Sequence, residues 1–132
     1  TLKMADVRRP GHINPEHARY ELHRVWVVEA TLKEGMSHIY ARRVFYIDED
    51  SWIVMATDKY DGRGELWRVS EQHSINFYDI PMAYGTIEVH HDLQSGRYLA
   101  MGLRNEEPKV YERIQRSAAD FTPAGLRGVG TR

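Results

Sequence analysis

The chain has 132 residues, and its 18 Lys and Arg residues nearly balance 19 Asp and Glu residues, which gives a formal net charge of −1. This length predicts a single domain, and the absence of a basic excess argues against nucleic acid as the partner. Cysteine is absent, which excludes disulfides, thiolate catalysis and Cys-ligated zinc. No apolar run approaches the roughly 20 residues of a membrane-spanning helix, so we expect a domain that does not span a membrane.

Residues 1–19 are polar and are interrupted by Pro10, Gly11 and Pro15, which predicts an irregular leading segment. They include neither an initiator Met nor the apolar core of a signal peptide. We therefore expect the chain to be the C-terminal part of a longer exported protein. An antiparallel β domain is predicted over residues 20–116, followed by a tail over 117–132 that contains a short helical turn.

Four strands are predicted before residue 74, at 20–32, 39–47, 52–60 and 66–73. In the first, the even positions are almost all apolar, which indicates one buried face. The others are dense in β-branched and aromatic residues, and they are joined by the turn sequences DEDS and DGRG. Joins of this length are too short for a crossover helix, so consecutive strands should be neighbours in one sheet.

Two further strands, at 86–91 and 96–103, are predicted around a DLQSG turn, with Val89, Leu99 and Met101 facing the core. The preceding sequence SINFYDIPMAYG contains a proline and a glycine and predicts an irregular connection. Residues 109–115 alternate as a strand does, although Pro108 is also compatible with the first turn of a helix. The fold class is therefore mainly β: an up-and-down antiparallel sheet of six or seven strands, with little helix, that tends to curl.

Several long ordered strings carry a family resemblance: YELHRVWVVEATL, HIYARRVFYIDEDSW, YDGRGELWRV, RYLAMGLRNE and DFTPAGLR. They resemble the C-terminal part of domain-of-unknown-function family 1329, a Gram-negative envelope family, over about residues 13–127. The resemblance implies a fold similar to that of the outer-membrane lipoprotein-sorting proteins. Such a fold is a curved, half-open barrel whose concave side holds apolar ligands. The resemblance supplies no catalytic residues.

Neither face of the two central strands is wholly polar, although a solvated sheet face would alternate strictly, so something should cover both sides. Large aromatic side chains are suited to the wall of an acyl-chain cavity, and equally to the core of a β domain. The predicted ligand-binding residues are Trp26, Tyr40, Tyr46, Trp52, Trp67, Phe77 and Tyr78.

Other chemistry finds weaker support in the sequence. Glu88, His90 and Asp92 share one face of a strand and have metal-ligand chemistry, but a solvated strand end explains them as well. The acidic residues near the turns do not follow the calcium-loop pattern, and no serine lies in a GxSxG context. Arg42 and Arg43 lie on opposite sheet faces, which argues against a joint anion site. We therefore expect no catalytic residue, no metal and no cofactor.

These observations predict a non-enzymatic domain of the periplasm or cell envelope that binds or transfers a lipid, a lipoprotein or another hydrophobic ligand. The first alternative is a protein-interaction module that docks on an envelope or transport partner through an edge strand or an apolar face. The second alternative is a β-barrel hydrolase or isomerase, which predicts a His and carboxylate pair inside a pocket. Uncovered sheet edges would also allow self-association.

Overall fold

The structure is a computed structural model, and it describes residues 2–80, 82–108 and 116–129. A short helix α1 (Met4–Val7) precedes a two-stranded antiparallel pair, β1 (Arg8–Arg9) and β2 (His12–Ile13). The main sheet has six strands: β3 (Val25–Thr31), β4 (Arg42–Asp48), β5 (Val54–Tyr60), β6 (Leu66–Phe77), β7 (Met82–Asp92) and β8 (Tyr98–Met101). Near the C-terminus are a 3-10 helix, η1 (Ala118–Phe121), and a helix, α2 (Pro123–Val129).

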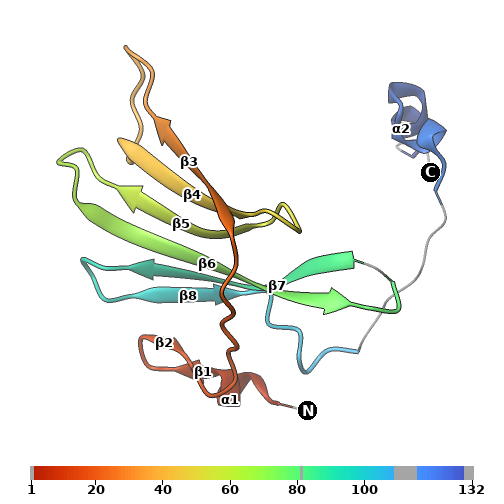
Figure 1. Ribbon diagram of the computed structural model, residues 1–132, viewed down its shortest axis with the longest axis horizontal. Helices are drawn as coiled ribbons and strands as arrows, with labels where there is room; N and C mark the ends of the chain where they lie inside the picture. The colour runs from red at the N-terminus through yellow and green to blue at the C-terminus, as the bar shows by residue number, and fades with distance from the viewer. Residues whose placement is uncertain (1, 81, 109–115, 130–132) are drawn as a thin grey trace.

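The six strands are antiparallel and follow one another across the sheet in chain order, as the short turns between them require (Figure 1). In the β5–β6 turn, the Asp61 carboxylate accepts hydrogen bonds from the amides of Arg63 and Glu65, and Gly64 takes a φ of +82°. These features suit the sequence DGRG to a tight reversal. The sheet is curved and does not close, so the predicted fold class is confirmed.

The structure corrects several predicted strand boundaries. β3 begins at Val25, five residues later than predicted, so residues 20–24 are not part of the sheet. The run SINFYDIPMAYG, predicted to be irregular, instead lengthens β6 to Phe77 and starts β7 at Met82, so that the two strands form one long hairpin. The short helical turn predicted in the tail corresponds to α2. The predicted strand at 109–115 lies outside the described residues.

Residues 2–13 pack beside the β8 edge and contribute to the core. The Tyr98 hydroxyl donates to the carbonyl of Arg9 over 2.8 Å, and the Asn105 side chain donates to the carbonyl of Leu2 over 2.9 Å. Val7 and Ile13 are two of the four hydrophobic residues that are buried in the described part of the chain; the others are Val44 and Val89. The leading segment, predicted to be irregular, is thus packed against the sheet.

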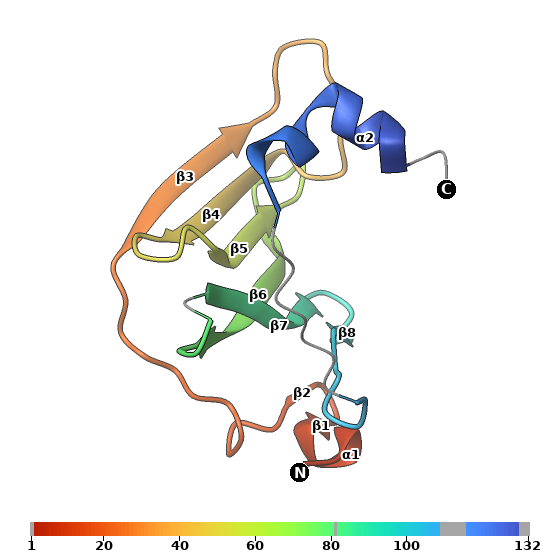
Figure 2. The ribbon, with the colours of Figure 1, turned by 90° about the vertical axis from the view of Figure 1, so that its right-hand side faces the viewer.

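Residues 14–24, which we call the strap, run from β2 beside one edge of the sheet to β3 at the other edge (Figures 1 and 2). The Tyr20 hydroxyl donates to Glu71 over 3.3 Å, and its ring meets the His73 ring edge-on at 5.8 Å between centroids. His23 Nδ1 lies 2.8 Å from Asp48 Oδ1. Since Glu71 and His73 are in β6 and Asp48 ends β4, the strap passes over the middle of the sheet.

The register divides the side chains of the sheet between two faces. The strap face carries Val44, Glu71 and Val89, because Val89 pairs with Glu71 and the strap contacts Glu71. The opposite face carries Phe45, Ser70 and His90. Val89 is fully buried, whereas Leu99 and Met101 are on the opposite face and are 54% and 48% exposed. The prediction that Leu99 and Met101 face the core is therefore wrong, because both side chains lie on the face of β8 that points away from the strap.

The predicted buried face of the first strand is also wrong. Trp26 and Val28 are 53% and 44% exposed, because β3 is the edge strand and pairs only with β4 in the described sheet. The accessible surface of the molecule is 10776 Å². A compact monomer of 15.4 kDa would expose about 7,200 Å². The fold is thus an open layer with a small core, and much apolar surface remains in contact with water.

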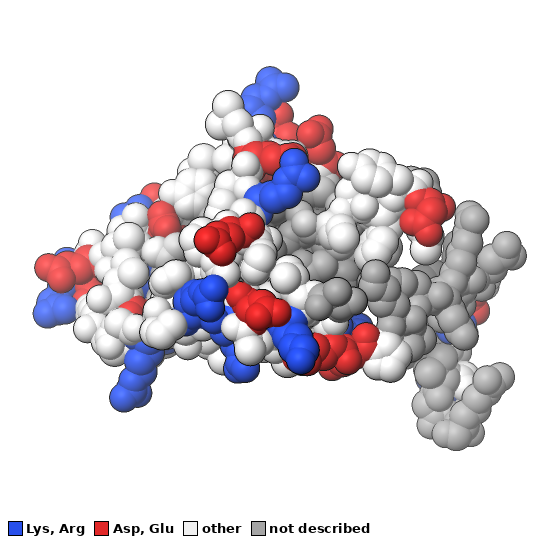
Figure 3. Space-filling view, turned by 90° about the horizontal axis from the view of Figure 1, so that it is seen from below, with Lys and Arg blue, Asp and Glu red and all other residues white. Residues whose placement is uncertain are grey.

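Among the described residues, no helix combines the length and the apolar composition that crossing a membrane would require. Positive and negative side chains alternate with uncharged ones over the face of the molecule seen from below in Figure 3. No continuous basic surface is visible from that side.

Candidate ligand-binding site

The seven aromatic residues predicted to bind a ligand do not converge on one cavity. Trp26 lies on the opposite face, while Tyr46 lies on the strap face and donates its hydroxyl to Asp58 over 2.8 Å. Trp52 is in the β4–β5 loop, where it is exposed and has a φ of +59°. The remaining four divide into two groups at opposite ends of β6: Tyr40 with Trp67, and Phe77 with Tyr78.

Tyr40 and Trp67 belong to a polar and aromatic cluster. Their rings meet edge-on at 5.7 Å, and the Arg68 guanidinium lies 4.3 Å from the centroid of the Trp67 ring while donating to the Tyr40 hydroxyl over 2.9 Å. Trp67 Nε1 and Arg68 Nε both donate to the same oxygen of Asp92. The Ser95 amide and the Arg68 guanidinium lower the pKa of Asp92 to about 2. Hydrogen bonds thus connect Tyr40, Trp67, Arg68 and Asp92 into one network, which makes this corner of the sheet rigid.

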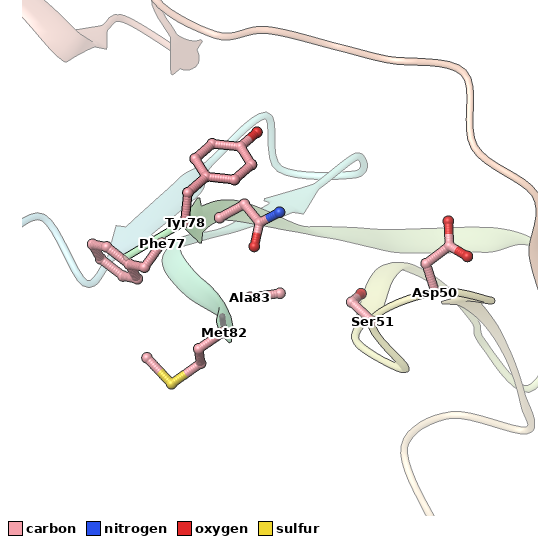
Figure 4. Close-up of a pocket in the computed structure, with 7 residues that line it drawn as sticks. Asp50, Ser51, Phe77, Tyr78, Met82 and Ala83 are labelled. Carbon is pink, nitrogen blue, oxygen red and sulfur yellow. The ribbon is translucent and has the colours of Figure 1, made fainter. Parts of the chain in front are cut away.

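Phe77 and Tyr78 line an open cleft of about 440 Å³ between the end of the β6–β7 hairpin and the β4–β5 loop. Met82 and Ala83 lie on the hairpin side, and Asp50 and Ser51 lie on the loop side (Figure 4). In that view the Phe77 ring and the Met82 side chain are turned away from Asp50 and Ser51. Tyr78 is 88% exposed, so this cleft is a shallow gap in contact with solvent and not an enclosed channel.

A second cleft, of about 210 Å³, opens on the opposite face around Ser70, which is itself buried. Lys59 donates a hydrogen bond to the Ser70 hydroxyl, whose oxygen also lies 2.7 Å from His90 Nδ1. His90 Nε2 is 3.6 Å from Glu88. Burial lowers the pKa of Lys59, and the nearby Arg68 and Arg43 lower it further. The cleft therefore offers an amine, a hydroxyl and an imidazole in a partly desolvated setting, and the carboxylates of Glu71 and Glu88 also line it.

The strap face carries a separate polar pair beneath the strap. Glu71 Oε2 is 3.6 Å from His73 Nε2, and both side chains contact Tyr20. His73 lowers the pKa of Glu71, whereas burial and then Glu71 raise the pKa of Tyr20. His73 Nε2 is buried and makes no hydrogen bond within the described structure. This pair holds the strap against the sheet.

One group in the described residues brings three metal-ligand atoms within 4.8 Å of one another: His23, Asp48 and Asp50. Asp48 is buried, and its second oxygen accepts hydrogen bonds from the amide and hydroxyl of Ser51 at 2.8 and 2.6 Å. The Ser51 hydroxyl is the largest cause of the lowered pKa of Asp48. Since His23 bonds Asp48 directly, this group connects the strap to the sheet by hydrogen bonds.

Glu88, His90 and Asp92, the set with metal-ligand chemistry in the sequence, share a face but do not form a ligand set. His90 is engaged with Ser70, and Asp92 is engaged with Trp67 and Arg68. Sequence reasoning missed the meeting of Lys59, Ser70 and His90, because it depends on the register of three strands. A serine, a lysine and a histidine at like positions of neighbouring predicted strands were the available signal.

Comparison with known proteins places the chain in a family. The family described as "Protein of unknown function (DUF1329)" matches residues 1–127. An uncharacterized protein of Pseudomonas aeruginosa, PA3922, is 52% identical over 132 residues, which are 99% of this chain and 29% of that protein.

Two solved structures are similar in fold. A DUF1329 family protein from Desulfovibrio piger has a TM-score of 0.50 at 17% identity, over 77% of this chain and 40% of that one. The LolA superfamily protein NE2245 from Nitrosomonas europaea has a TM-score of 0.48 at 18% identity, over 63% of this chain and 37% of that one. The chain thus spans less than half the length of each of these proteins. The match over nearly its whole length shows that it belongs to the family of proteins of unknown function DUF1329.

Proposed function

We propose that the protein is a non-enzymatic carrier or receptor domain that binds a hydrophobic ligand, such as a lipid or the acyl chain of a lipoprotein, on its curved sheet. One observation carries the proposal: large apolar side chains stay exposed on both faces of a sheet that does not close. Exposed apolar surface of this extent is typical of a binding surface and is uncommon in a self-contained monomer.

Binding would operate by exclusion of water and requires no covalent step. Each methylene of a ligand that leaves water contributes about 0.8 kcal/mol, so an acyl chain of a dozen carbons can be held firmly by apolar contact alone. The seven aromatic residues named in the sequence remain candidates for such contacts, at more than one place. Tyr78 at the 440 Å³ cleft, Trp52 in the β4–β5 loop and Trp26 on the opposite face are the most accessible of them.

We propose that the protein acts in the periplasm or cell envelope, as its sequence resemblance to a Gram-negative envelope family implies. The likeness to the Desulfovibrio protein supports the fold and nothing finer. A lipid or an envelope protein is the expected partner class.

One observation supports the hydrolase alternative: Ser70, His90 and Glu88 line the same cleft. Their geometry argues against nucleophilic catalysis. The His90–Glu88 separation of 3.6 Å is too long for the hydrogen bond that would orient the imidazole, and Lys59 donates to the hydroxyl that would have to attack. We therefore assign these residues to binding.

The test is the lipid content and lipid affinity of the full chain, purified from an envelope fraction. Organic extraction followed by mass spectrometry should recover acyl chains in roughly stoichiometric amount, and the delipidated protein should bind the neutral dye Nile red with a blue-shifted emission. Trp26→Ala should weaken dye binding more than Phe121→Ala, which removes an exposed aromatic ring outside the sheet. A preparation with no acyl chains and no dye binding would contradict the proposal.

A second function is favoured by the edge of the sheet. β3 pairs on one side only in the described sheet, and Trp26, Val27 and Val28 are exposed in succession along it. An edge of this kind can accept a further strand from a partner protein. Replacement of Val27 by proline removes an edge amide, and loss of partner binding with unchanged dye binding would favour the interaction module over the carrier.

A further inference from the structure

Three cations stand directly opposite one another in neighbouring strands on the opposite face. Arg43 of β4 is the register partner of Lys59 in β5, and Lys59 is the register partner of Arg68 in β6. Side chains paired in this way have Cβ atoms about 4.5–5.5 Å apart, and like charges so placed repel one another. The row therefore concentrates positive charge on one face of the sheet, although the whole protein has a net charge of −1.

The described structure compensates this charge only in part. Asp92 continues the row in β7 and binds Arg68 over 2.9 Å, which satisfies one of the three cations. Asp58 precedes Lys59 in β5, but it lies on the strap face and accepts from Tyr46. Glu88, two residues before His90 in β7, lies 3.6 Å from the imidazole of His90. Arg43 and Lys59 have no carboxylate partner among the described residues.

Lys59, the middle residue of this row, lines the 210 Å³ cleft. Its amine is half-buried and bonds the buried Ser70 hydroxyl, so part of its hydration has been lost without a counter-charge. The lowered pKa of Lys59, caused by burial, Arg68 and Arg43, has the same origin. Glu71 and Glu88 line the cleft as well, but neither forms an ion pair with Lys59. An anion beside Arg43 and Lys59 would offset the repulsion along the row, and the guanidinium, the amine and the Ser70 hydroxyl would be its hydrogen-bonding partners.

Apolar side chains begin immediately beside the cations. Phe45 is two residues from Arg43, whose guanidinium lies 5.7 Å from the centre of its ring, and Val28 is the register partner of Phe45. The next row along β3, β4 and β5 is Trp26, Ile47 and Val54. Val54 also lines the cleft, and it is exposed, as are Trp26 and Val28. Charge and apolar surface are thus adjacent on one side of the sheet.

We propose that Arg43, Lys59 and Ser70 bind the anionic headgroup of an amphiphile whose alkyl chain lies over Val28, Phe45, Trp26 and Val54. The headgroup is a carboxylate or a phosphate, as in a fatty acid or a phospholipid. This inference rests on the proposed binding of a hydrophobic ligand and adds the chemical class of that ligand.

The experiment measures displacement of Nile red from the full chain by three twelve-carbon ligands: dodecanoate, dodecyl phosphate and neutral dodecanol. We expect both anions, or one of them, to bind at least ten-fold more tightly than dodecanol, which corresponds to about 1.4 kcal/mol. The tighter of the two anions identifies the headgroup. The preference should shrink in high salt, because the headgroup contacts are only partly shielded from water.

Arg43→Gln and Lys59→Met should each lower the affinity for the preferred anion about ten-fold and leave dodecanol binding unchanged. Arg42→Gln is the matched control, because it removes the same charge from the neighbouring residue, which lies on the strap face and pairs with Glu29. Lys59→Met should also raise the thermal midpoint of the ligand-free protein, since it relieves repulsion along the row.

Equal affinity for anionic and neutral ligands, or an equal loss in Arg42→Gln and Arg43→Gln, would overturn the headgroup assignment and leave the carrier function standing. Failure of all three ligands and of the dye to bind would instead overturn the carrier function itself, and the headgroup assignment with it.

Discussion

A comparison of two neighbouring apolar residues tests whether the sheet is covered on one face only. Val89 in β7 is fully buried beneath the strap face, and Leu99 in β8 is 54% exposed on the opposite face. Sequence alone would favour Leu99 as the more important core residue, because leucine is larger. The structure predicts the reverse order of cost for Val89→Ala and Leu99→Ala.

The magnitudes follow from the carbon atoms that leave the core. Val89→Ala removes two buried methyl groups, worth about 1.6 kcal/mol at 0.8 kcal/mol each, and the cavity left behind adds up to about 1 kcal/mol. Leu99→Ala removes three carbons, but just under half of their surface is buried, so its cost is about 1 kcal/mol with no cavity. In a chain of this size, roughly 3–5 °C in thermal midpoint accompanies each kcal/mol. We therefore expect a drop of about 5–13 °C for Val89→Ala and about 3–5 °C for Leu99→Ala.

The assay is urea unfolding of delipidated protein at 25 °C, followed by circular dichroism, with thermal melts as a second measure. The comparison requires equal slopes of unfolding free energy against urea for both variants, so that the free energies refer to the same surface exposed. A cost for Leu99→Ala equal to or above that for Val89→Ala would refute the reasoning, because it would show that the opposite face is packed in the protein.

Three further predictions concern the strap, the cluster at Asp92 and one turn. The Asp48 bond raises the pKa of His23 above 6.5, so its contribution is complete below pH 6.5 and is lost as pH rises through the raised value; the lowered pKa of Asp48 places its own loss below pH 3.8. The stability difference between wild type and His23→Ala should therefore be largest between about pH 4 and 6.5, and a difference that grows above pH 7 would contradict this. Asp92 stabilises the fold above pH 3.8 and loses this effect as pH falls toward about 2; Asp92→Asn should lower stability at pH 7, flatten its fall between pH 4 and 2 and alter Trp67 fluorescence, all measurable in urea titrations. Gly102 has a φ of +74° and a Cβ there would collide with the Thr86 carbonyl, whereas Gly96 has a φ of +69° and open space; Gly96→Ala should cost about 1 kcal/mol from backbone strain and Gly102→Ala clearly more, and equal melting points would oppose the collision.

The order of the strands was readable from the sequence because it depends on local features. The turns DEDS and DGRG and the β-branched runs between them specify a meander, in which each strand pairs with the next. The length of the β6–β7 hairpin was missed for a physical reason. Pro81 and Gly85 suggest interruption, but Gly85 lies within β7, where the Gln72 side chain crowds the backbone and a Cβ would collide with it.

The functional surface was less predictable, because it depends on which rows of the sheet come together. Arg42 and Arg43 were assigned correctly to opposite faces, which argued against an anion site shared by the two. The register changes the meaning of that fact, since Arg43 meets Lys59 and Arg68 across the strands. Cross-strand neighbours are far apart in sequence, so alternation predicts the face of each residue but not its partners. The strap illustrates the same limit: Tyr20 was assigned to a strand, and its contact with Glu71 is 51 residues away.

The small core and the proposed ligand are two aspects of one balance. The described part of the chain has four buried hydrophobic residues, of which only two are in the main sheet, so much of the favourable transfer of apolar surface from water is unused. A ligand that covers the opposite face supplies that transfer, and at a hundred times its dissociation constant it adds about 2.7 kcal/mol to stability. Ligand binding and folding are then coupled, and the cost of Val28→Ala, at a residue over which the alkyl chain is proposed to lie, should rise when the ligand is present. Because this exposed apolar face costs free energy in water, covering it makes the ligand-bound protein more stable than the ligand-free protein.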